Sequence, residues 1–274
     1  MARVLDVGRE NNEFQRLEVL KRNRAKRKQY GQIFVEGVAP VGALLKAGWS
    51  VHTVAYDRER PLSAWAQDVL RRARPQKVLR LAPELMEKLS DRTDPSELIV
   101  VAERRLRTLD EVQVNDRSIV VVFDRPSNHG NLGSLIRSCD AFGASGLVTL
   151  GHSVDPFDPA VIRASLGAFF SLPVVHCESP RGLERWLHDV RLRVPDMKVV
   201  GTSPQAPTPL DAADLSGPVT ILLGNEAEGM SRALTALADE CVFIPMMGSV
   251  DSLNVACAGT AVLYEVVRQR RAAG

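Results

Sequence analysis

The sequence has no long hydrophobic run. No apolar stretch approaches the roughly 18 residues that a membrane-spanning helix needs. The opening residues, MARVLDVGRENN, lack the apolar segment of a secretory signal. A membrane protein and a secreted protein are therefore not supported, and we expect a cytoplasmic protein.

Cysteine is scarce and is not arranged for metal binding or for a disulfide framework. The cysteines are widely separated and form no CxxC pair; they are Cys139, Cys177, Cys241 and Cys257. Zinc sites built from thiols usually need closely spaced cysteines, and disulfide frameworks are typical of small secreted domains. We therefore expect no metal site and ordinary buried thiols, since a free cysteine behaves as a small hydrophobic side chain.

Positive charge is concentrated in the first part of the chain, although the net charge is only +2. Residues 1–115 contain 22 Lys and Arg against 16 Asp and Glu, whereas residues 116–274 contain 13 against 17. The densest basic stretch runs from Arg16 to Lys28, with Glu18 as its acidic residue. This asymmetry indicates either that the first part binds a polyanion or that the stretch is the solvated face of a helix.

The first hundred residues alternate between β-like and helix-like segments. Apolar runs predict strands at 32–37, 51–57, 77–82 and 97–103. Amphipathic patterns predict helices at 41–49, 62–74 and 83–90. Such alternation is typical of a small α/β sandwich. A polar segment without clear period, 104–117, follows it.

A second α/β series begins with the run SIVVVFD at 118–124, which has the composition of a strand buried in a parallel sheet. Further strands are predicted at 146–150, 172–176, 197–202, 219–224 and 242–246. Helices are predicted at 131–142, near 160–168, at 182–193 and at 252–271. We therefore assign residues 1–107 to a first domain, 108–117 to a linker and 118–274 to a second domain.

The first candidate motif runs from Asn128 to Arg137, directly after a predicted strand. A strand that leads into a Gly-rich turn and a helix start offers free backbone N–H groups to an anion. Gly130 and Gly133 would allow a ligand to approach the backbone closely. The segment contains neither GK[ST] nor GxGxxG, which disfavours a nucleotide-binding oxidoreductase.

The second candidate motif, Leu222 to Gly229, also follows a strand of the second domain. Ligands of open α/β sheets bind at the carboxyl ends of the strands. Glu226 and Glu228, flanked by glycines, are placed to accept hydrogen bonds from a ligand. The alternative is a tight turn with solvated acids.

The third candidate motif runs from Ile244 to Val255. Ser252 is positioned to cap the following helix, and Asn254 then falls in the first turn without an evident structural task. The helix sequence VACAGTAVLYEVV is rich in small residues. It must therefore pack closely against another element, either inside the domain or in a second copy of the chain.

Together these segments resemble the signature motifs of the SpoU/TrmH branch of the SPOUT methyltransferases. The NxGxxxR pattern followed by FG appears as Asn131, Gly133 and Arg137 before Phe142 and Gly143. The LxxGxExxG pattern is matched at Gly224, Glu226 and Gly229, and IPMxGxxxSLNVxxAxxxxLYE by residues 244–265. Within the family, the sequence looks most like the ribosomal RNA methyltransferases linked to antibiotic resistance. The stretch KRNRAKRKQYGQIFVEG resembles the opening of the L30e-like domain that often precedes this catalytic domain.

The resemblance implies a parallel α/β domain whose C-terminal chain forms a deep trefoil knot, preceded by a smaller L30e-like α/β domain. It implies an S-adenosylmethionine-dependent enzyme, active as a homodimer, that methylates the ribose 2′-OH of a nucleotide in RNA. The implied cofactor-binding residues are Leu223, Gly224, Asn225, Gly229, Ile244, Met246, Ser252 and Leu253.

The resemblance also implies a catalytic set consisting of Arg137, Asn131, Glu226, Ser252 and Asn254. Arg137 either acts as a base through an adjacent phosphate or holds that phosphate while another group takes the proton. The second role fits the high pKa of a guanidinium better. A structural alternative is an ion pair between Arg137 and Asp140. Asn131 and Asn254 would orient Arg137 or the ribose, and Glu226 would hold its loop or pair with Arg137.

The RNA-binding residues implied by the resemblance are Arg22, Arg24, Lys26 and Arg163. For Arg163 a plain surface charge is an equal alternative. A separate N-terminal domain favours a structured substrate, and 23S ribosomal RNA is the leading expectation. Transfer RNA as the substrate, and a non-catalytic RNA-binding protein, remain the alternatives. The complete polar set of the catalytic motifs argues against the second of these.

Overall fold

The computed structural model describes residues 2–90 and 95–273, which form two compact units. The first unit contains Met1–Arg105 and Asp155–Ser171, and the second contains Leu106–Val154 and Leu172–Gly274. The sequence assigns residues 155–171 to the second domain, but their contacts group them with the first unit. Residues 159–164 pack on the strand 32–36, and residues 168–171 pack on the helix 38–46. Arg27 also forms a buried ion pair with Asp155 at 2.8 Å. Within the described residues, no helix has the length and apolar character to span a membrane.

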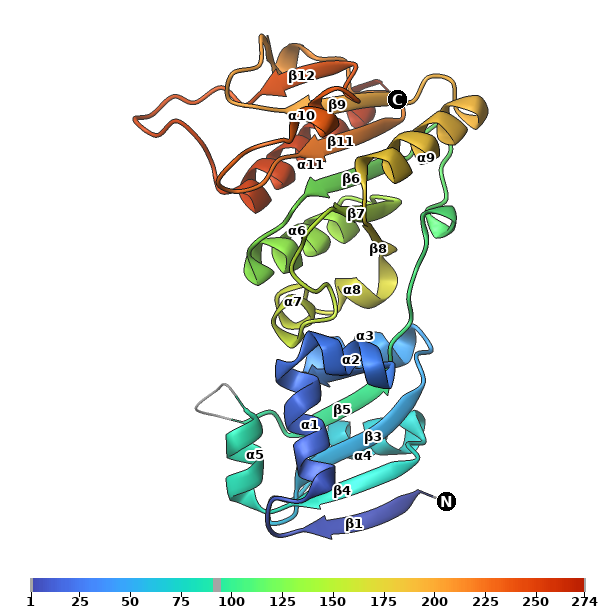
Figure 1. The fold of residues 1–274 in the computed structure, drawn as a ribbon, viewed down its shortest axis with the longest axis vertical. Coiled ribbons are helices and arrows are strands. Elements are labelled where there is room, and N and C mark those ends of the chain that lie inside the picture. The colour runs from blue at the N-terminus through green and yellow to red at the C-terminus, as the bar shows by residue number, and fades with distance from the viewer. Residues whose placement is uncertain (1, 91–94, 274) are drawn as a thin grey trace. The chain divides into compact units, whose positions relative to one another are not determined.

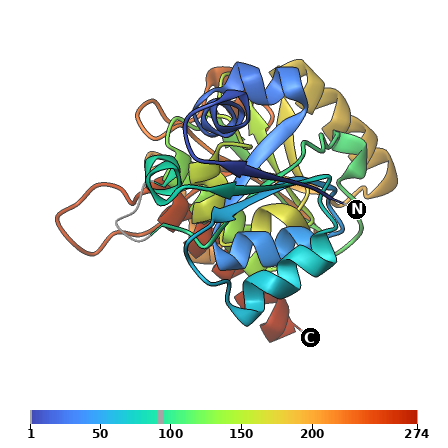
Figure 2. The same cartoon turned by 90° about the horizontal axis from the view of Figure 1, so that it is seen from below.

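The first unit contains a mixed sheet with helices on both faces (Figures 1 and 2). Its strands are β1 (Arg3–Val7), β2 (Gln32–Glu36), β3 (Val51–Asp57), β4 (Lys77–Leu81) and β5 (Leu98–Glu103). Its helices are α1 (Asn12–Arg22), α2 (Arg24–Tyr30), α3 (Val38–Lys46), α4 (Ala64–Ala73), α5 (Pro83–Leu89), α7 (Pro159–Ala164) and α8 (Ala168–Ser171). The strand order is β1–β4–β3–β5–β2, in which β5 runs antiparallel to β2 and β3. The α/β sandwich expected for this part of the chain is confirmed.

Helix α1 shows why the first thirty residues fold as they do. The side chain of Asn11 caps the helix by accepting from the backbone N–H groups of Glu13 and Phe14. Phe14 and Leu17 then fall one turn apart and are buried against the sheet. The predicted elements did not include β1, α1 or α2. The sequence of α1 has many charged residues and few apolar ones, so its amphipathic pattern was not recognised.

The second unit contains a sheet in which all adjacent strands pair in parallel. Its strands are β6 (Ile119–Asp124), β7 (Gly146–Leu150), β8 (Val174–Cys177), β9 (Lys198–Thr202), β10 (Thr208–Pro209), β11 (Val219–Leu223) and β12 (Glu240–Phe243). Its helices are η1 (Leu109–Glu111), α6 (His129–Ala141), α9 (Pro180–Arg193), η2 (Leu210–Ala212), α10 (Arg232–Thr235) and α11 (Val255–Ala273). The strand order is β10–β12–β9–β11–β6–β7–β8.

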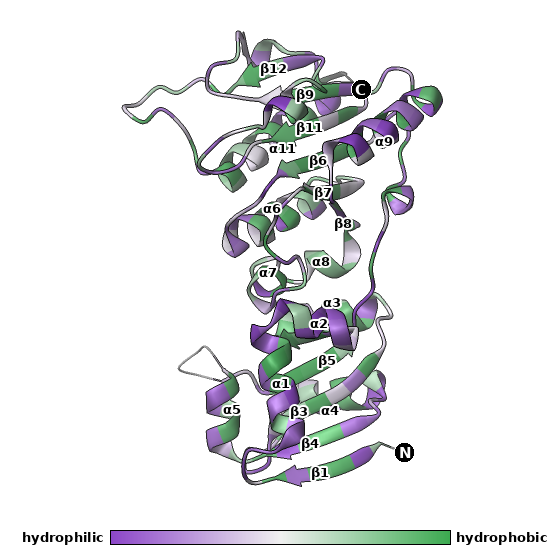
Figure 3. Cartoon of the chain, viewed as in Figure 1, coloured by the Kyte–Doolittle hydropathy of each residue, from purple (hydrophilic) through white to green (hydrophobic). Residues whose placement is uncertain are grey.

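The middle strands of this sheet are buried on both faces, which explains their uninterrupted apolar sequences. Figure 3 shows β6 and β11 as hydrophobic strands and α9 with a hydrophilic outer side. The predicted parallel sheet is therefore confirmed. The missed strand β10 contains only two residues in a Pro-rich loop, and such a short segment has no detectable period.

Helix α11 packs on α6 within the same unit. A Cβ atom added at Gly259 would lie 2.6 Å from Leu135 Cδ1 and 2.8 Å from Leu223 Cδ1. The small residues of α11 thus allow two helices and a strand to approach closely, as the sequence predicted. The closely packed partner is inside the domain.

Candidate functional site

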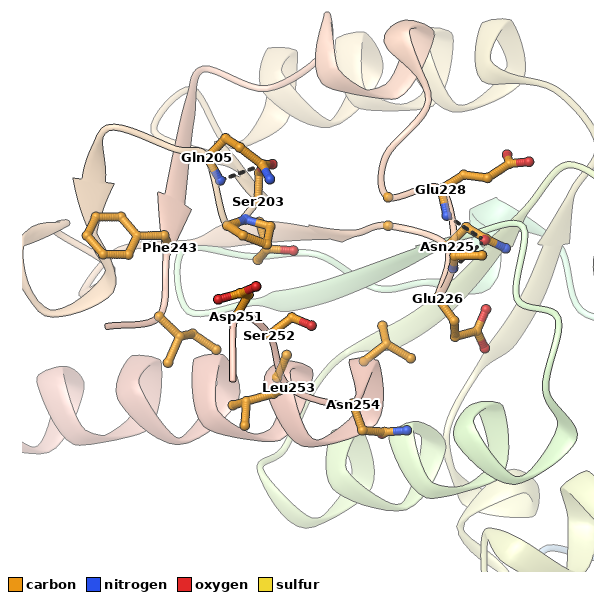
Figure 4. A pocket seen from close by; sticks show the side chains of 18 of the residues that line it. Ser203, Gln205, Asn225, Glu226, Glu228, Phe243, Asp251, Ser252, Leu253 and Asn254 are labelled. Carbon is orange, nitrogen blue, oxygen red and sulfur yellow. Dashed lines mark hydrogen bonds between the residues drawn. The ribbon is translucent and has the colours of Figure 1, made fainter. Parts of the chain in front are cut away.

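A cavity of about 630 Å³ lies at the carboxyl ends of β9, β11 and β12 (Figure 4). Three loops line it: residues 202–205 after β9, residues 224–229 after β11 and residues 242–255 from the end of β12 to the start of α11. The three strands are neighbours in the sheet, so their loops meet at one edge. This is the edge at which parallel α/β sheets bind ligands.

Gly224 brings two backbone segments into contact below the cavity. A Cβ atom at this position would lie 2.4 Å from the Gly229 carbonyl carbon and from the Met230 nitrogen. The Asn225 and Gly229 backbones exchange hydrogen bonds of 2.9 and 3.0 Å. The loop therefore closes on itself tightly, and only a glycine fits at residue 224.

The Glu226 carboxylate joins this loop to the start of α6. It accepts from Ser127 Oγ at 2.8 Å, from the backbone N–H groups of Ser127 and Asn128 at 3.2 and 3.3 Å, and from Asn131 Nδ2 at 3.2 Å. Figure 4 shows the side chains of Glu226 and Asn254 at the cavity beside this helix. Of the two expected roles for Glu226, the contacts match holding the loop.

The pKa of Glu226 is lower than that of an ordinary glutamate. Partial burial alone would raise the pKa, but hydrogen bonds from its own backbone and from Ser127 and Asn131 outweigh that effect. These donors stabilise the ionised carboxylate. Glu226 is thus an anion at neutral pH, with its oxygens already engaged.

Asn131 and Asn254 link the first and third motifs. Asn254 Nδ2 donates to Asn131 Oδ1 at 2.9 Å. Asn254 Oδ1 also accepts from the backbone N–H groups of Ala256 and Cys257 at 2.9 and 3.4 Å. Asn254 therefore caps α11, which begins at Val255. The expectation that Ser252 is the cap was wrong, because the helix begins later than the apolar pattern suggested; Ser252 lines the cavity instead.

A second carboxylate network holds the 225–231 loop from the other side. Asp124 is 1% exposed, and its Oδ2 accepts from the backbone N–H of Ser231 at 2.7 Å. Arg125 has a left-handed backbone with φ of 45° and forms ion pairs with Asp124 and Glu228. Asn225 Nδ2 donates to the Arg125 carbonyl oxygen at 2.7 Å. Sequence analysis did not single out Asp124 or Arg125.

Arg137 lies on the exposed side of α6 and does not line the cavity. The described residues provide no hydrogen-bond or ion-pair partner for its guanidinium, neither Glu226 nor Asp140. An exposed arginine without an intramolecular partner is available to a ligand or to another chain.

Most of the expected site residues lie together. The cavity lining includes Asn131, Glu226, Ser252 and Asn254 of the expected catalytic set, and Gly224, Asn225, Gly229, Ile244, Met246 and Leu253 of the expected cofactor set. Leu223 is instead 1% exposed and belongs to the sheet core. The lining also includes Thr202, Ser203 and Gln205, which sequence reasoning missed. Thr202 ends β9, and Ser203 and Gln205 follow it, so a rule that takes the loop after every strand at this edge would have found them.

The residues expected to bind RNA lie in the first unit. Arg22 and Arg24 are exposed, and Lys26 donates to Gln29 at 3.1 Å. Arg163 Nη1 instead donates to Glu36 Oε1 at 2.9 Å, and the Glu36 side chain is 2% exposed. Arg163 thus has a structural partner that neither of its two expected roles included.

The cysteines are all free, as expected, but they are not all buried. Cys139 and Cys177 are buried, Cys241 is half-buried and Cys257 is exposed. In the described part of the chain, no cluster of three His, Cys, Asp or Glu side chains is arranged to hold a metal ion.

The parallel sheet and its edge loops define an α/β protein that binds its ligand between loops at the strand ends. The family model of the SpoU rRNA Methylase family matches residues 118–264, and that of the SpoU L30e-like domain matches residues 11–100. The chain belongs to the SpoU rRNA Methylase family. The resemblance to this family is confirmed, and so is the expected fold class of a parallel-sheet α/β domain preceded by an L30e-like domain.

Similar proteins cover nearly the whole chain. A 23S rRNA (uridine(2479)-2′-O)-methyltransferase from Streptomyces viridochromogenes is 41% identical over 95% of this chain and 91% of its own length. The SpoU methyltransferase AviRb from the same species, solved with the cofactor AdoMet, matches with a TM-score of 0.88 and 40% identity over 96% of this chain and all of that one. An AdoMet-bound rRNA methyltransferase from Sinorhizobium meliloti matches with a TM-score of 0.86 and 28% identity, over 97% of this chain and 98% of that one.

Proposed function

We propose that this protein transfers a methyl group from S-adenosylmethionine to the ribose 2′-OH of a nucleotide in 23S ribosomal RNA. The observation that carries the proposal is the cavity at the edge of the parallel sheet, where Asn131, Glu226 and Asn254 are joined by hydrogen bonds. The relative named as a 23S rRNA 2′-O-methyltransferase supports the choice of RNA and of the ribose oxygen. A ribosomal RNA substrate implies a cytoplasmic site of action.

The residues of the cavity fit S-adenosylmethionine. Its volume of about 630 Å³ lies within the roughly 300 to 1,000 Å³ of small-molecule sites. The tight loop at Gly224 forms part of the cavity wall, and Ile244, Met246 and Leu253 add apolar surface. We assign Leu223 to the floor behind this wall. Bound there, the cofactor would supply a methyl group on a sulfonium. The S–C bond would break as the new bond from the methyl carbon to the ribose oxygen forms, and S-adenosylhomocysteine would leave.

The polar residues of the cavity position the reacting groups. Glu226 is ionised and occupied by four donors, so it fixes the start of α6 and is not the base. Asn131 and Asn254 hold each other and keep the first and third motifs at a constant separation. Ser252, also on the cavity wall, is assigned to the cofactor.

Arg137 is assigned to the RNA. A guanidinium group offers donors and no acceptor, so Arg137 holds a phosphate next to the target ribose and does not itself accept the proton of the 2′-OH. Its position outside the cavity supports a contact with the substrate rather than with the cofactor. In the first unit, the exposed Arg22 and Arg24 and the half-buried Lys26 are assigned to RNA contacts, with Arg163 held against Glu36.

We further propose a knotted C-terminal segment and a homodimer. Support for the knot comes from the path after β12, where residues 244–254 run back along the cavity before α11 packs on α6. Support for a dimer comes from the exposed Arg137, which has no partner among the described residues. A second subunit would bring it to a cavity.

The test is a methyl-transfer assay with labelled S-adenosylmethionine and separate ribosomal and transfer RNA pools. We expect label on ribosomal RNA, and primer extension at low nucleotide concentration should stop at one 2′-O-methylated position. Label on transfer RNA alone would identify transfer RNA, and not ribosomal RNA, as the substrate. Label on base atoms would reject the reaction, and label on neither pool would favour a non-catalytic RNA-binding protein.

A further inference from the structure

A small polar recess lies beside α1 in the first unit, far in sequence from the motifs of the cavity. Its volume is about 260 Å³, below the roughly 300 to 1,000 Å³ of typical small-molecule sites. Its polar lining consists of Asn12, Glu13, Arg16, Gln32, His52, Thr53 and Lys77. We call it the α1 recess. Its size suits one chemical group rather than a whole cofactor.

The charge of the α1 recess is positive. Arg16 and Lys77 contribute two cations, and Glu13 contributes one carboxylate, which contacts Lys77 Nζ at 2.7 Å. The pKa of His52 is lowered by burial first and then by Lys77 and Arg16, whereas Glu13 raises it. Two cations therefore act on the same small volume and are only partly compensated.

The cations of the recess retain donors that the protein does not use. The described residues give Arg16 one hydrogen bond, from Nη2 to Gln32 Oε1 at 2.9 Å, and its guanidinium stacks 3.7 Å from the Tyr30 ring centre. Lys77 donates one of its three N–H groups to Glu13. The Tyr30 and Gln32 contacts hold the guanidinium in one place, so its remaining N–H groups are preorganised.

A β-bulge turns His52 into the recess. Strict alternation along β3 would place His52 on the opposite face from Thr53. The register of β3 against β5 shifts between Val51 and Thr53, however, and His52 Nδ1 lies 2.8 Å from Thr53 Oγ1. Bulges commonly re-aim a side chain at a binding site. The strand irregularity and the charges thus point to the same place.

We propose that the α1 recess binds a backbone phosphate of the RNA substrate. The inference rests on the proposed function, since RNA is the polyanion that the protein would meet. Arg16 and Lys77 donate to the phosphate oxygens, and His52 lines the third side. Arg16, which lines the recess, is the first residue of the basic stretch 16–28. Arg27 of the same stretch is buried and cannot reach RNA.

The test compares RNA binding by full-length variants without any methyl donor. Arg16→Gln and Lys77→Gln should each weaken binding of a 23S ribosomal RNA transcript about tenfold, as expected for one charged hydrogen bond. Each should also reduce the slope of log affinity against log salt by about one. Fluorescence anisotropy over a salt series measures both quantities, and circular dichroism melting confirms that each variant folds.

Arg71→Gln is the matched control. Arg71 is an exposed cation on α4, and α4 and α1 cover opposite faces of the sheet (Figure 2). This variant should bind RNA within about twofold of the wild type. An equal loss in Arg71→Gln would overturn the proposal, because it would indicate a general charge effect. So would unchanged binding by folded Arg16→Gln and Lys77→Gln.

Glu13→Gln tests the sign of the ligand charge. Removing a carboxylate from a phosphate site should tighten RNA binding, whereas the loss of a structural partner should weaken it. Weaker binding would therefore count against the proposal. Because no product is measured, RNA binding that follows these expectations without methyl transfer would reject the proposed enzyme and retain the α1 recess.

Discussion

At the scale of a single residue, Arg137 is expected to affect methyl transfer without affecting cofactor binding. Its side chain is exposed on α6 and lies outside the cavity, so it should affect the substrate and not the cofactor. We expect Arg137→Ala to reduce methyl transfer by about 10²-fold or more and to leave S-adenosylmethionine affinity unchanged by calorimetry. The matched control is Arg185→Ala, another exposed arginine of the second unit on α9. A wild-type rate in Arg137→Ala would contradict the assignment.

Glu226 should make the stability of the second unit depend on pH. Its folded pKa is below the ordinary value of 4.5, so its contribution to stability is fully present above that pH. The contribution is lost as the pH falls through the folded pKa, when the carboxylate is protonated. The difference in unfolding free energy between wild type and Glu226→Gln should therefore be largest at neutral pH and shrink in acid. Urea titrations at several pH values measure it, and a difference that grows in acid would contradict the assignment.

At the scale of elements, Arg27 fastens α2 to α7 inside the first unit. Its side chain is 2% exposed and forms ion pairs of 2.8 Å with Asp155 and Asp158. Arg27→Ala would leave the Asp155 charge buried without its partner, at a cost of about 3 to 5 kcal/mol. Lys28→Ala, an exposed neighbour, should change stability by no more than about 0.5 kcal/mol. Chemical denaturation of both variants tests this, and equal midpoints would exclude an anchoring role.

Gly224 tests whether the tight loop after β11 shapes the cavity. Gly224→Ala would place a methyl group against the backbone of Gly229 and Met230, which cannot move aside as a flexible side chain would. We expect the affinity for S-adenosylmethionine to fall about tenfold or more, or roughly 1.4 kcal/mol. Gly217→Ala is the control, because a Cβ atom there meets nothing within 4 Å. Calorimetry measures the affinity of both variants for S-adenosylmethionine. Equal affinities would show that the tight loop at Gly224 does not shape the cavity.

At the scale of the whole molecule, the proposed dimer makes a direct prediction. Size-exclusion chromatography with light scattering should give a mass near 60 kDa, about twice the 30.0 kDa of the chain. Mixing Arg137→Ala with the cavity variant Gly224→Ala should also restore activity if each cavity uses an arginine of its partner, because one site of each mixed dimer then has an intact cavity and an arginine. A fully active monomer would contradict both expectations.

Local patterns in the sequence predicted most elements of both units and most residues of the cavity. Strand β3 (Val51–Asp57) and strand β7 (Gly146–Leu150) have the predicted bounds, because their apolar runs are flanked by clear breaks. The order of the three motifs was also sufficient to indicate the family. Short-range signals sufficed here because each motif directly follows a strand, and parallel strands place their carboxyl ends together.

Only the tertiary structure decided which charges face solvent and which are buried. Arg27 and Lys28 are neighbours in one basic stretch, yet Arg27 is buried against carboxylates more than a hundred residues away and Lys28 is exposed. Asn254 caps α11 and donates to Asn131. The second of these contacts also depends on the packing of elements that are far apart in the sequence. A sequence pattern records the local period of each element. The partner of a polar side chain is set by the packing of distant elements. Local sequence patterns therefore could not predict it.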